Sequence, residues 1–211
     1  MGLKGKKILI TAGPTWVPID DVRIISNVAT GRTGILLARE AAVRRAEVTL
    51  VLGPGEERVR GKLSRLIRFR FFSELKDILQ RELKNKKYDI VIHSAAVSDF
   101  KPEYKLKGKL NSDKGCRLKL IPLEKLVVLI RRFAPKSILV MFKLESTVTD
   151  KTLIQRAKSS RDMVSADMVV ANRLNPYRAF IIDKKGNRTK VKNREQLAKK
   201  LIKLLNTVFN N

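Results

Sequence analysis

The chain of 211 residues contains one cysteine, one histidine and no long apolar run. Because Cys116 is the single cysteine, no intrachain disulfide can form, which fits a reducing cytoplasm. No apolar stretch has the length of a membrane-spanning helix, and the opening MGLKGKKILITAG lacks the apolar core of a signal peptide. We therefore expect a cytoplasmic protein, with no membrane partner.

Acidic and aromatic residues are also scarce. The 46 lysine and arginine residues outnumber the 20 aspartate and glutamate residues, giving a formal net charge of +26, and aromatic residues make up only 6%. Such a charge attracts nucleic-acid backbones, or steers small polyanionic substrates into a cleft. The basic residues are spread along the whole chain, without interleaved aromatic residues that would stack on bases. We therefore interpret the charge as scattered over the surface and do not expect a nucleic-acid partner.

What the chain does contain is an alternation of apolar runs and amphipathic segments. Their periodicity predicts strands at 6–13, 47–55, 66–72, 88–97, 137–146 and 167–173, and a hairpin at 179–191. It predicts helices at 34–46, 73–86, 123–134, 150–160 and 193–209, the second of which starts at a serine N-cap, Ser73.

Strands separated by helices of this length indicate an α/β protein with a mostly parallel sheet. We expect a Rossmann-like three-layer fold in which residues 1–211 form a single domain. The C-terminal β-hairpin adds an antiparallel edge or a subdomain. The long irregular stretch 98–118 exceeds the usual length of a connection, so we interpret it as a functional flap.

The loop after the first predicted strand has the composition of a phosphate-binding loop. Gly13 permits a tight turn, and the polar run that contains Gly31 and Gly34 opens into a helix whose free amide groups can bind an anion. Yet no GK[ST] sequence is present, and the glycine spacing does not match the GxGxxG fingerprint of dinucleotide-binding proteins. Ligands of open parallel sheets bind at the carboxyl ends of the strands, so the segments after four strands are expected to converge at one edge.

The segments ITAGPT, PIDDVRIISN and ATGRTG, followed by IHSAAVSDF, GKL, MFKLES and DMVVANR, occur in this order along nearly the whole chain. In sequence and order they resemble phosphopantothenate–cysteine ligase, also named phosphopantothenoylcysteine synthetase. That family acts in coenzyme A biosynthesis and is often fused behind a flavin-dependent decarboxylase. The length of this chain leaves no room for the decarboxylase, so we expect a stand-alone form without flavin.

The resemblance implies a ligase that joins 4'-phosphopantothenate to cysteine through an acyl-nucleotide, an acyl-cytidylate where CTP is used. Lys109, in the flap, matches the family lysine associated with formation of the acyl-nucleotide. Asn27 matches the asparagine that handles this intermediate for attack by cysteine. Arg23, as a fork for phosphate or carboxylate, and Ala96 match substrate-binding positions. The resemblance also implies a homodimer in which the flap or the terminal hairpin is exchanged.

Most of the matching positions belong to the nucleotide site. They are Gly13, Ser26, Gly31, Thr33, Gly34, Ala95, Val97, Asp99, Lys109 and Phe142. Within this set, Asp99 is the expected ligand of Mg²⁺ beside the triphosphate. Phe142 and the backbone of 95–97 match the part of the family that holds the base. His93 is expected to be packed inside the protein rather than catalytic.

The sequence departs from the family pattern near the expected base pocket. Arg173 replaces an aspartate, Met141 replaces a glycine, and the segment 175–180 is shortened. These departures leave open whether CTP or another nucleotide is preferred.

Two other classes of function remain as alternatives. An NAD(P)-dependent reductase of the short-chain type needs a Tyr-x-x-x-Lys pair, but Tyr88, Tyr104 and Tyr177 are not followed by lysine at that spacing. A basic nucleic-acid-binding module would retain DNA or RNA with a steep dependence on salt and would not turn over CTP.

Overall fold

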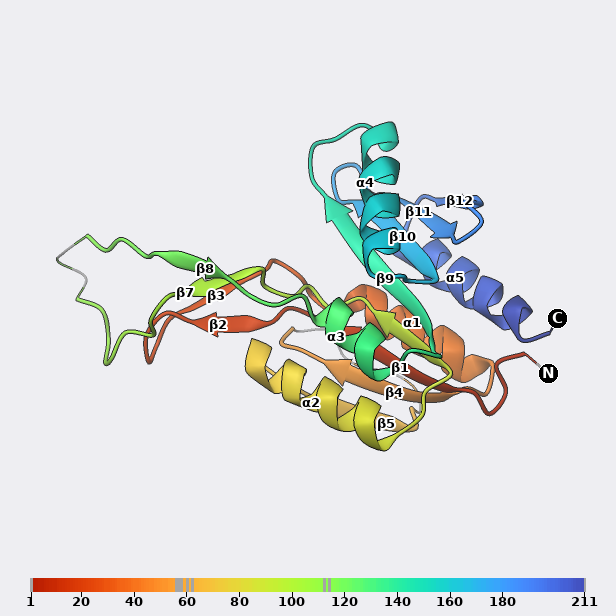
Figure 1. The fold of residues 1–211 in the computed structure, drawn as a ribbon, viewed down its shortest axis with the longest axis horizontal. Coiled ribbons are helices and arrows are strands. Elements are labelled where there is room, and N and C mark those ends of the chain that lie inside the picture. The colour runs from red at the N-terminus through yellow and green to blue at the C-terminus, as the bar shows by residue number, and fades with distance from the viewer. Residues whose placement is uncertain are drawn as a thin grey trace.

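A central sheet with helices on both faces forms the body of the protein, and an arm extends from one side of it (Figure 1). The computed structural model describes residues 2–55, 59, 61, 63–111, 113 and 115–210. The strands of the central sheet are β1 (Lys7–Ala12), β4 (Glu47–Leu52), β5 (Arg65–Arg68), β6 (Ile90–His93), β9 (Ile138–Glu145), β10 (Met168–Arg173), β11 (Arg178–Asp183) and β12 (Arg188–Val191). The helices of the described residues are α1 (Arg32–Val43), α2 (Phe72–Asn85), α3 (Leu126–Phe133), α4 (Asp150–Met163) and α5 (Arg194–Val208).

The strand order is β12-β11-β10-β9-β6-β1-β4-β5. The pairings from β5 to β10 are all parallel, whereas β10, β11 and β12 pair antiparallel. The predicted α/β fold with a mostly parallel sheet is therefore confirmed, and the predicted C-terminal hairpin forms one edge of that sheet. Strands β4 and β5 lie on one side of β1, whereas the later strands β6 and β9 lie on its other side. The strand order therefore reverses between β1 and β6, which is the position where such sheets bind ligands.

The two faces of the sheet build two apolar cores. Helices α1 and α5 cover one face, and α2, α3 and α4 cover the other. Strands β1 and β6 are buried almost throughout, which explains their uninterrupted apolar sequence. No helix in the described part of the chain is both long and apolar enough to cross a membrane.

Side chains cap the helices where the sequence offers suitable acceptors. Asn193 accepts the amide of Gln196 at 2.7 Å and begins α5, as expected. The predicted cap of α2 at Ser73 is wrong, because the helix starts one residue earlier, at Phe72. Here the Glu74 carboxylate reaches back and accepts the amides of Arg70 and Phe71 at 2.6 and 3.2 Å. Two hydrogen bonds to a charged acceptor replace the single bond that a serine would accept.

The arm consists of two short strand pairs that the sequence did not indicate. Strands β2 (Trp16–Pro18) and β3 (Ile24–Ser26) form a hairpin, and β7 (Phe100–Pro102) pairs antiparallel with β8 (Leu120–Pro122). The stretch 98–118, predicted to be wholly irregular, thus begins with a strand that pairs just beyond its other end. The loop after β1 contains a hairpin before it reaches α1.

Close contact between α1 and β1 depends on glycine. A Cβ atom added to Gly34 would lie 2.3 Å from Cβ of Ala12 and 2.9 Å from Oγ of Ser94. No side chain fits there unless the helix moves away from the sheet.

Gly34→Ala is therefore expected to lower the free energy of unfolding by about 1–3 kcal/mol through overpacking. Urea unfolding measures the change, and Gly115→Ala, where an added Cβ meets nothing within 4 Å, is the control. Equal stability of the two variants would contradict this account of the contact.

A buried carboxylate ties α2 to the edge strand β5. Glu82 accepts hydrogen bonds from Arg65 at 2.8 Å, from Tyr88 at 2.8 Å and from Lys86 at 3.0 Å. Burial by itself would raise the pKa of Glu82, but the hydrogen bonds from Tyr88, Lys86 and Arg65 outweigh it and hold the pKa below its usual value.

Glu82→Gln should lower the free energy of unfolding at pH 7 by about 1–3 kcal/mol, because buried donors lose a charged acceptor. Since the folded pKa is depressed, this stabilisation is present above the unfolded pKa of about 4.3 and is lost as the pH falls through the folded pKa. Urea unfolding of both proteins at pH 7 and near pH 3 tests this, and a difference that does not shrink in acid would refute it.

Candidate functional site at the carboxyl edge of the sheet

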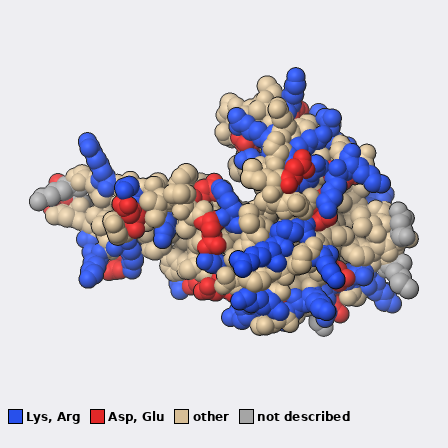
Figure 2. All heavy atoms as spheres, viewed as in Figure 1, with Lys and Arg blue, Asp and Glu red and all other residues tan. Residues whose placement is uncertain are grey.

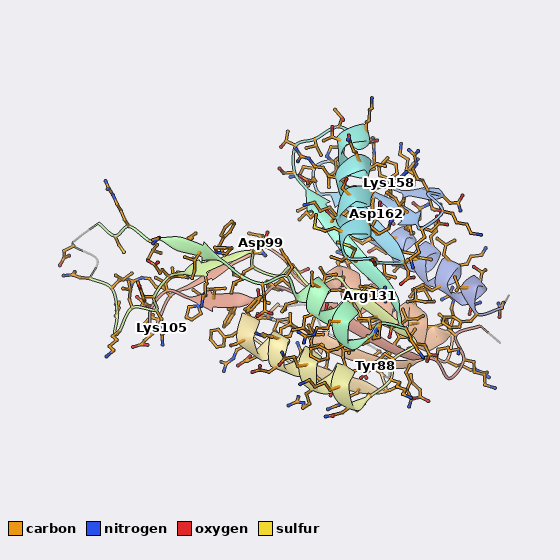
Figure 3. The ribbon with its side chains drawn as sticks, in the orientation of Figure 1. Tyr88, Asp99, Lys105, Arg131, Lys158 and Asp162 are labelled. Carbon is orange, nitrogen blue, oxygen red and sulfur yellow. The ribbon has the colours of Figure 1, made fainter. Side chains whose placement is uncertain are left out.

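The carboxyl ends of β10, β9, β6 and β1 lie side by side, as the sequence predicted. Beyond the regular strands, Pro14 bridges to Ala96, and the amide of Ala96 donates to the Gly13 carbonyl at 2.9 Å. The turns after β1 and β6 therefore run together. Figure 2 shows a notch between the arm and the part of the body that carries α4, and Asp99 lies at the root of the arm beside it (Figure 3).

The amino terminus of α1 opens at this edge. Gly31 precedes the helix with φ of 79°, and the first helical hydrogen bond is donated by the Ile35 amide to the Gly31 carbonyl at 3.1 Å. The first-turn amides, including those of Thr33 and Gly34, have no acceptor within the helix and suit an anion.

Two glycines that the sequence analysis did not identify, Gly53 and Gly55, pack against the segment between β1 and α1. A Cβ on Gly53 would lie 2.4 Å from the Pro14 carbonyl oxygen, and one on Gly55 would lie 2.7 Å from the Thr30 carbonyl oxygen. Gly13 itself has φ of 81° and packs against the Gly53 backbone. The GPG sequence after β4 was the available signal for this close packing.

Asn27 connects the arm to the turn after β6. Its Nδ2 donates to the carbonyls of Ala96 at 3.0 Å and Val97 at 3.2 Å, while the residue remains exposed. The structure thus brings Asn27 together with Ala95, Ala96 and Val97. The side-chain oxygen of Asn27 remains available to a ligand.

His93 lies beneath this turn and is buried. Its Nδ1 is 2.8 Å from Oγ1 of Thr11, which also accepts the amide of Ala95 at 3.3 Å. Burial lowers the pKa of His93 to about 4, so the ring is neutral near pH 7. The prediction that His93 is packed inside the protein is confirmed, and through Thr11 it supports the turn after β6.

Asp99, the expected Mg²⁺ ligand, is paired with a lysine that sequence reasoning did not identify. Lys125 Nζ lies 2.5 Å from Oδ1 of Asp99, and both side chains are largely exposed. No cluster of three or more metal-ligating side chains occurs among the described residues. Mg²⁺ commonly binds through one or two carboxylates together with substrate phosphates. Asp99 therefore fits an ion that arrives with a triphosphate, provided that Lys125 moves away.

Arg23 and Lys109 lie at the distal end of the arm, not at the sheet edge. Arg23 Nη1 donates to Oδ2 of Asp20 at 2.7 Å and to the Leu110 carbonyl at 3.3 Å. Four residues of mostly extended chain, about 13 Å, separate Arg23 from Asn27. Lys109 lies between residues that are bonded to the hairpin turn, whereas Asn27 is bonded to the turn after β6, and no hydrogen bond or ion pair among the described residues joins the two side chains.

The remaining predicted residues lie on or near the edge. Phe142 follows the β9 residue that pairs with the end of β6, and it packs partly against the core. Ser26 is exposed at the end of β3. Arg173, at the family's aspartate position, donates to the Val148 carbonyl at 3.2 Å and approaches Asp150 at 3.5 Å.

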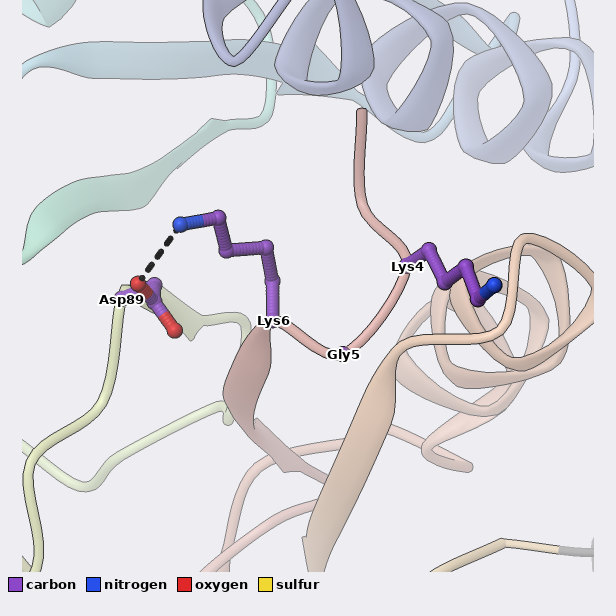
Figure 4. Close-up of a pocket in the computed structure, with 4 residues that line it drawn as sticks. All are labelled: Lys4, Gly5, Lys6 and Asp89. Atoms are coloured by element: carbon purple, nitrogen blue, oxygen red, sulfur yellow. Dashed lines mark hydrogen bonds and ion pairs between the residues drawn. The ribbon is translucent and has the colours of Figure 1, made fainter. Parts of the chain in front are cut away.

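Two open pockets of about 550 Å³ each are lined by residues outside the turns after β1, β6, β9 and β10. One is lined by Lys4, Gly5, Lys6 and Asp89 at the amino ends of the strands (Figure 4). The other lies along β5 and α2, between Ile67 and Arg81. Neither contains a residue that the sequence motifs singled out, so the chemistry of the side chains and not pocket size identifies the site.

Comparison with known proteins identifies a family over nearly the whole chain. Residues 3–208 match the family described as DNA/pantothenate metabolism flavoprotein C-terminal domain. The chain is 36% identical over 175 residues to Coenzyme A biosynthesis bifunctional protein CoaBC of Thermococcus kodakarensis, covering 83% of this chain and 43% of that protein.

Two solved structures share the fold. The DNA/pantothenate metabolism flavoprotein from Streptococcus pneumoniae has a TM-score of 0.86 and 24% identity, with 97% of this chain and 100% of that one covered. The C-terminal domain of Coenzyme A biosynthesis bifunctional protein CoaBC has a TM-score of 0.80 and 25% identity, with 99% and 97% covered.

The chain spans about half the length of the curated relatives it matches, from 41% to 59%. The match to these relatives covers 81% to 98% of this chain. The chain belongs to the family of the DNA/pantothenate metabolism flavoprotein C-terminal domain.

Proposed function

We propose that this protein is a phosphopantothenate–cysteine ligase of coenzyme A biosynthesis. The observation that carries the proposal is the bond network of Asn27, which joins the arm to the turn after β6 beside the amino terminus of α1. This network uses the family motifs ISN and SAAV together, in a chain whose relatives are named as coenzyme A biosynthesis proteins. A cytoplasmic location fits this role.

The reaction has two steps. The carboxylate of phosphopantothenate attacks the α-phosphate of a nucleoside triphosphate, which forms an acyl-nucleotide and releases pyrophosphate. The amine of cysteine then attacks the acyl carbon, the bond to the nucleotide phosphate breaks, and the amide forms as the nucleoside monophosphate leaves. Both substrates of the first step are anions, so the site needs cations and oriented donors where negative charge accumulates.

Each part of the edge suits one of these needs. The first-turn amides of α1, with Thr33, suit a phosphate group, and the backbone of 95–97 with Phe142 suits the base. Mg²⁺ would be held by Asp99 and would neutralise charge on the triphosphate. Lys109 supplies positive charge in the first step, and Asn27 orients the acyl group for cysteine in the second. CTP is the proposed nucleotide.

The arm favours a homodimer. It exposes several large apolar side chains, which are Val22, Ile24, Phe100, Tyr104 and Leu120. Exposed apolar surface of this kind indicates a protein interface. In a twofold dimer the arm of one protomer can reach the sheet edge of the other. We propose that Lys109 acts beside the partner's Asn27 in this way.

Turnover with defined substrates tests the proposed function. Protein incubated with phosphopantothenate, cysteine, Mg²⁺ and CTP is expected to release pyrophosphate only when phosphopantothenate is present. Asn27→Asp should let the acyl-nucleotide accumulate, whereas Lys109→Gln should prevent its formation. ATP in place of CTP measures the nucleotide preference. No pyrophosphate release with any nucleotide would defeat the proposal, and identical products from the two variants would refute the division of roles.

Mixing the two inactive variants tests the composite site. If Lys109 serves the partner's Asn27, co-refolded Asn27→Asp and Lys109→Gln chains regain roughly a quarter of wild-type activity, because half of the dimers are mixed and each contains one intact site. If both residues act within one chain, no mixed dimer contains an intact site, and the co-refolded sample forms product no faster than the two variants combined without co-refolding. Light scattering gives the oligomeric state, and a monomer that is fully active would exclude the exchange.

A further inference from the structure

A carboxylate in the turn of the β2–β3 hairpin is fully enclosed although it lies at the distal end of the arm. The Asp20 side chain has 0% of its surface exposed. Its Oδ1 accepts the amides of Val22 and Arg23 at 2.7 and 2.6 Å. Its Oδ2 accepts Arg23 Nη1 at 2.7 Å and the amide of Leu110, ninety residues further along, at 3.0 Å. The hydrogen bond from Leu110, with those from Val22 and Arg23, holds the pKa of Asp20 far below its usual value.

The neighbouring residues bind the flap from the same turn. Asp21 accepts the Gly108 amide at 3.0 Å through Oδ2 and donates its own amide to the Gly108 carbonyl at 3.3 Å. Lys105 pairs with Asp21 at 2.6 Å, and Figure 3 places Lys105 at the distal end of the arm. Arg23 donates to the Leu110 carbonyl at 3.3 Å, so it holds the flap instead of being wholly free to act as a substrate fork.

These bonds fix the chain on both sides of one residue. Gly108 and Leu110 are each held through backbone amide and carbonyl groups, and Lys109 lies between them. Lys109 is exposed, and within the described part of the chain its ammonium group has no hydrogen-bond or ion-pair partner. A lysine side chain has many rotamers, so a fixed backbone is the main restriction on where its charge can be.

We propose that Asp20 is a positioning residue that fixes the backbone on both sides of Lys109 and so determines where the Lys109 ammonium enters the reaction. This inference rests on the proposed ligase function and extends it to the first step alone. Apart from Lys109, the proposed nucleotide contacts lie at the sheet edge, away from Asp20, and the attack of cysteine does not need Lys109. Loss of the Asp20 hydrogen bonds therefore slows formation of the acyl-nucleotide and leaves nucleotide binding and the attack of cysteine unchanged.

Asp20→Asn is the test, because it keeps the shape of the side chain, removes the charge and replaces one of the two acceptor oxygens with a donor NH₂ group. The kcat of pyrophosphate release is expected to fall about 10- to 100-fold, as a displacement near 1 Å of an acting group does. The KM for nucleotide should remain within about twofold, since the nucleotide site does not contact Asp20. Acyl-nucleotide isolated from the Asn27→Asp reaction tests the second step separately. The rate at which Asp20→Asn converts it to product with added cysteine should remain within about twofold of the wild-type rate.

Asp183→Asn is the matched control. The Asp183 carboxylate likewise holds a hairpin turn, accepting the amide and the Nδ2 of Asn187 at 2.9 and 2.8 Å, but this turn joins β11 and β12. The variant should keep wild-type rates in both steps. Asp21→Asn, which weakens the bonds to Gly108 and Lys105 and leaves those of Leu110 in place, provides a second variant with a smaller loss confined to the first step if Asp20→Asn does not fold.

The outcomes separate the inference from the function on which it rests. A wild-type rate of the first step in Asp20→Asn would overturn the inference, and so would an equal loss in both steps. If Asp20→Asn does not fold, a wild-type rate of the first step in Asp21→Asn, or an equal loss in both steps, would overturn the inference. Absence of pyrophosphate release from the wild-type protein would instead defeat the proposed function.

Discussion

The candidate site depends on how closely α1 approaches the ends of β1 and β4. An added Cβ would lie 2.3 Å from Cβ of Ala12 at Gly34 and 2.9 Å from Cδ1 of Leu52 at Gly31, so a larger residue would push the helix away from the strands. This contact brings the free amides of α1 next to the turn after β6. Asn27 then bonds to that turn, which places the root of the arm against the same edge. Helix, turns and arm are thereby fixed as one surface.

Lysine and arginine outnumber aspartate and glutamate, so each carboxylate can pair with any of several cationic residues. In this structure carboxylates hold cations in defined places: Glu82 holds Arg65 and Lys86, Asp99 holds Lys125, and Asp20 holds Arg23. Buried or fully bonded carboxylates order the structure far more than exposed pairs, because solvent weakens the latter. Asp20 and Glu82 therefore contribute to the architecture, whereas the exposed pair of Asp99 and Lys125 can open for a ligand.

The central sheet could be predicted from the sequence because its signals are local. Apolar runs such as that of β6 and the helical periodicity around α5 depend on neighbouring residues, and the order of segments then determined which strand ends would meet. The cap of α2 was misplaced because the Glu74 side chain reaches back to the amides of Arg70 and Phe71, so the helix begins before Ser73. The arm strands β2, β3, β7 and β8 have three residues each, too few to show a period.

Tertiary partners were beyond the reach of sequence patterns. The bond from Leu110 to Asp20 joins positions ninety residues apart, and Lys125 meets Asp99 across twenty-six. No local pattern specifies such pairs. The family motifs identified Asn27 and Lys109 as single residues, but their separation along the arm emerged only from the fold.

That separation has a physical reason. A lysine that lies permanently at the sheet edge finds a carboxylate, as Lys125 does with Asp99 at 2.5 Å, and its charge is then partly neutralised. On the arm, the nearby carboxylates of Asp20 and Asp21 are already bonded to Arg23, Lys105 and the flap backbone. Lys109 thus has no carboxylate partner among the described residues, and in the proposed reaction its charge would be available to the substrates. A charge acts most strongly where water has been excluded. In the proposed reaction, Lys109 on an arm whose backbone is fixed would therefore stabilise the negative charge that accumulates where the two anions react.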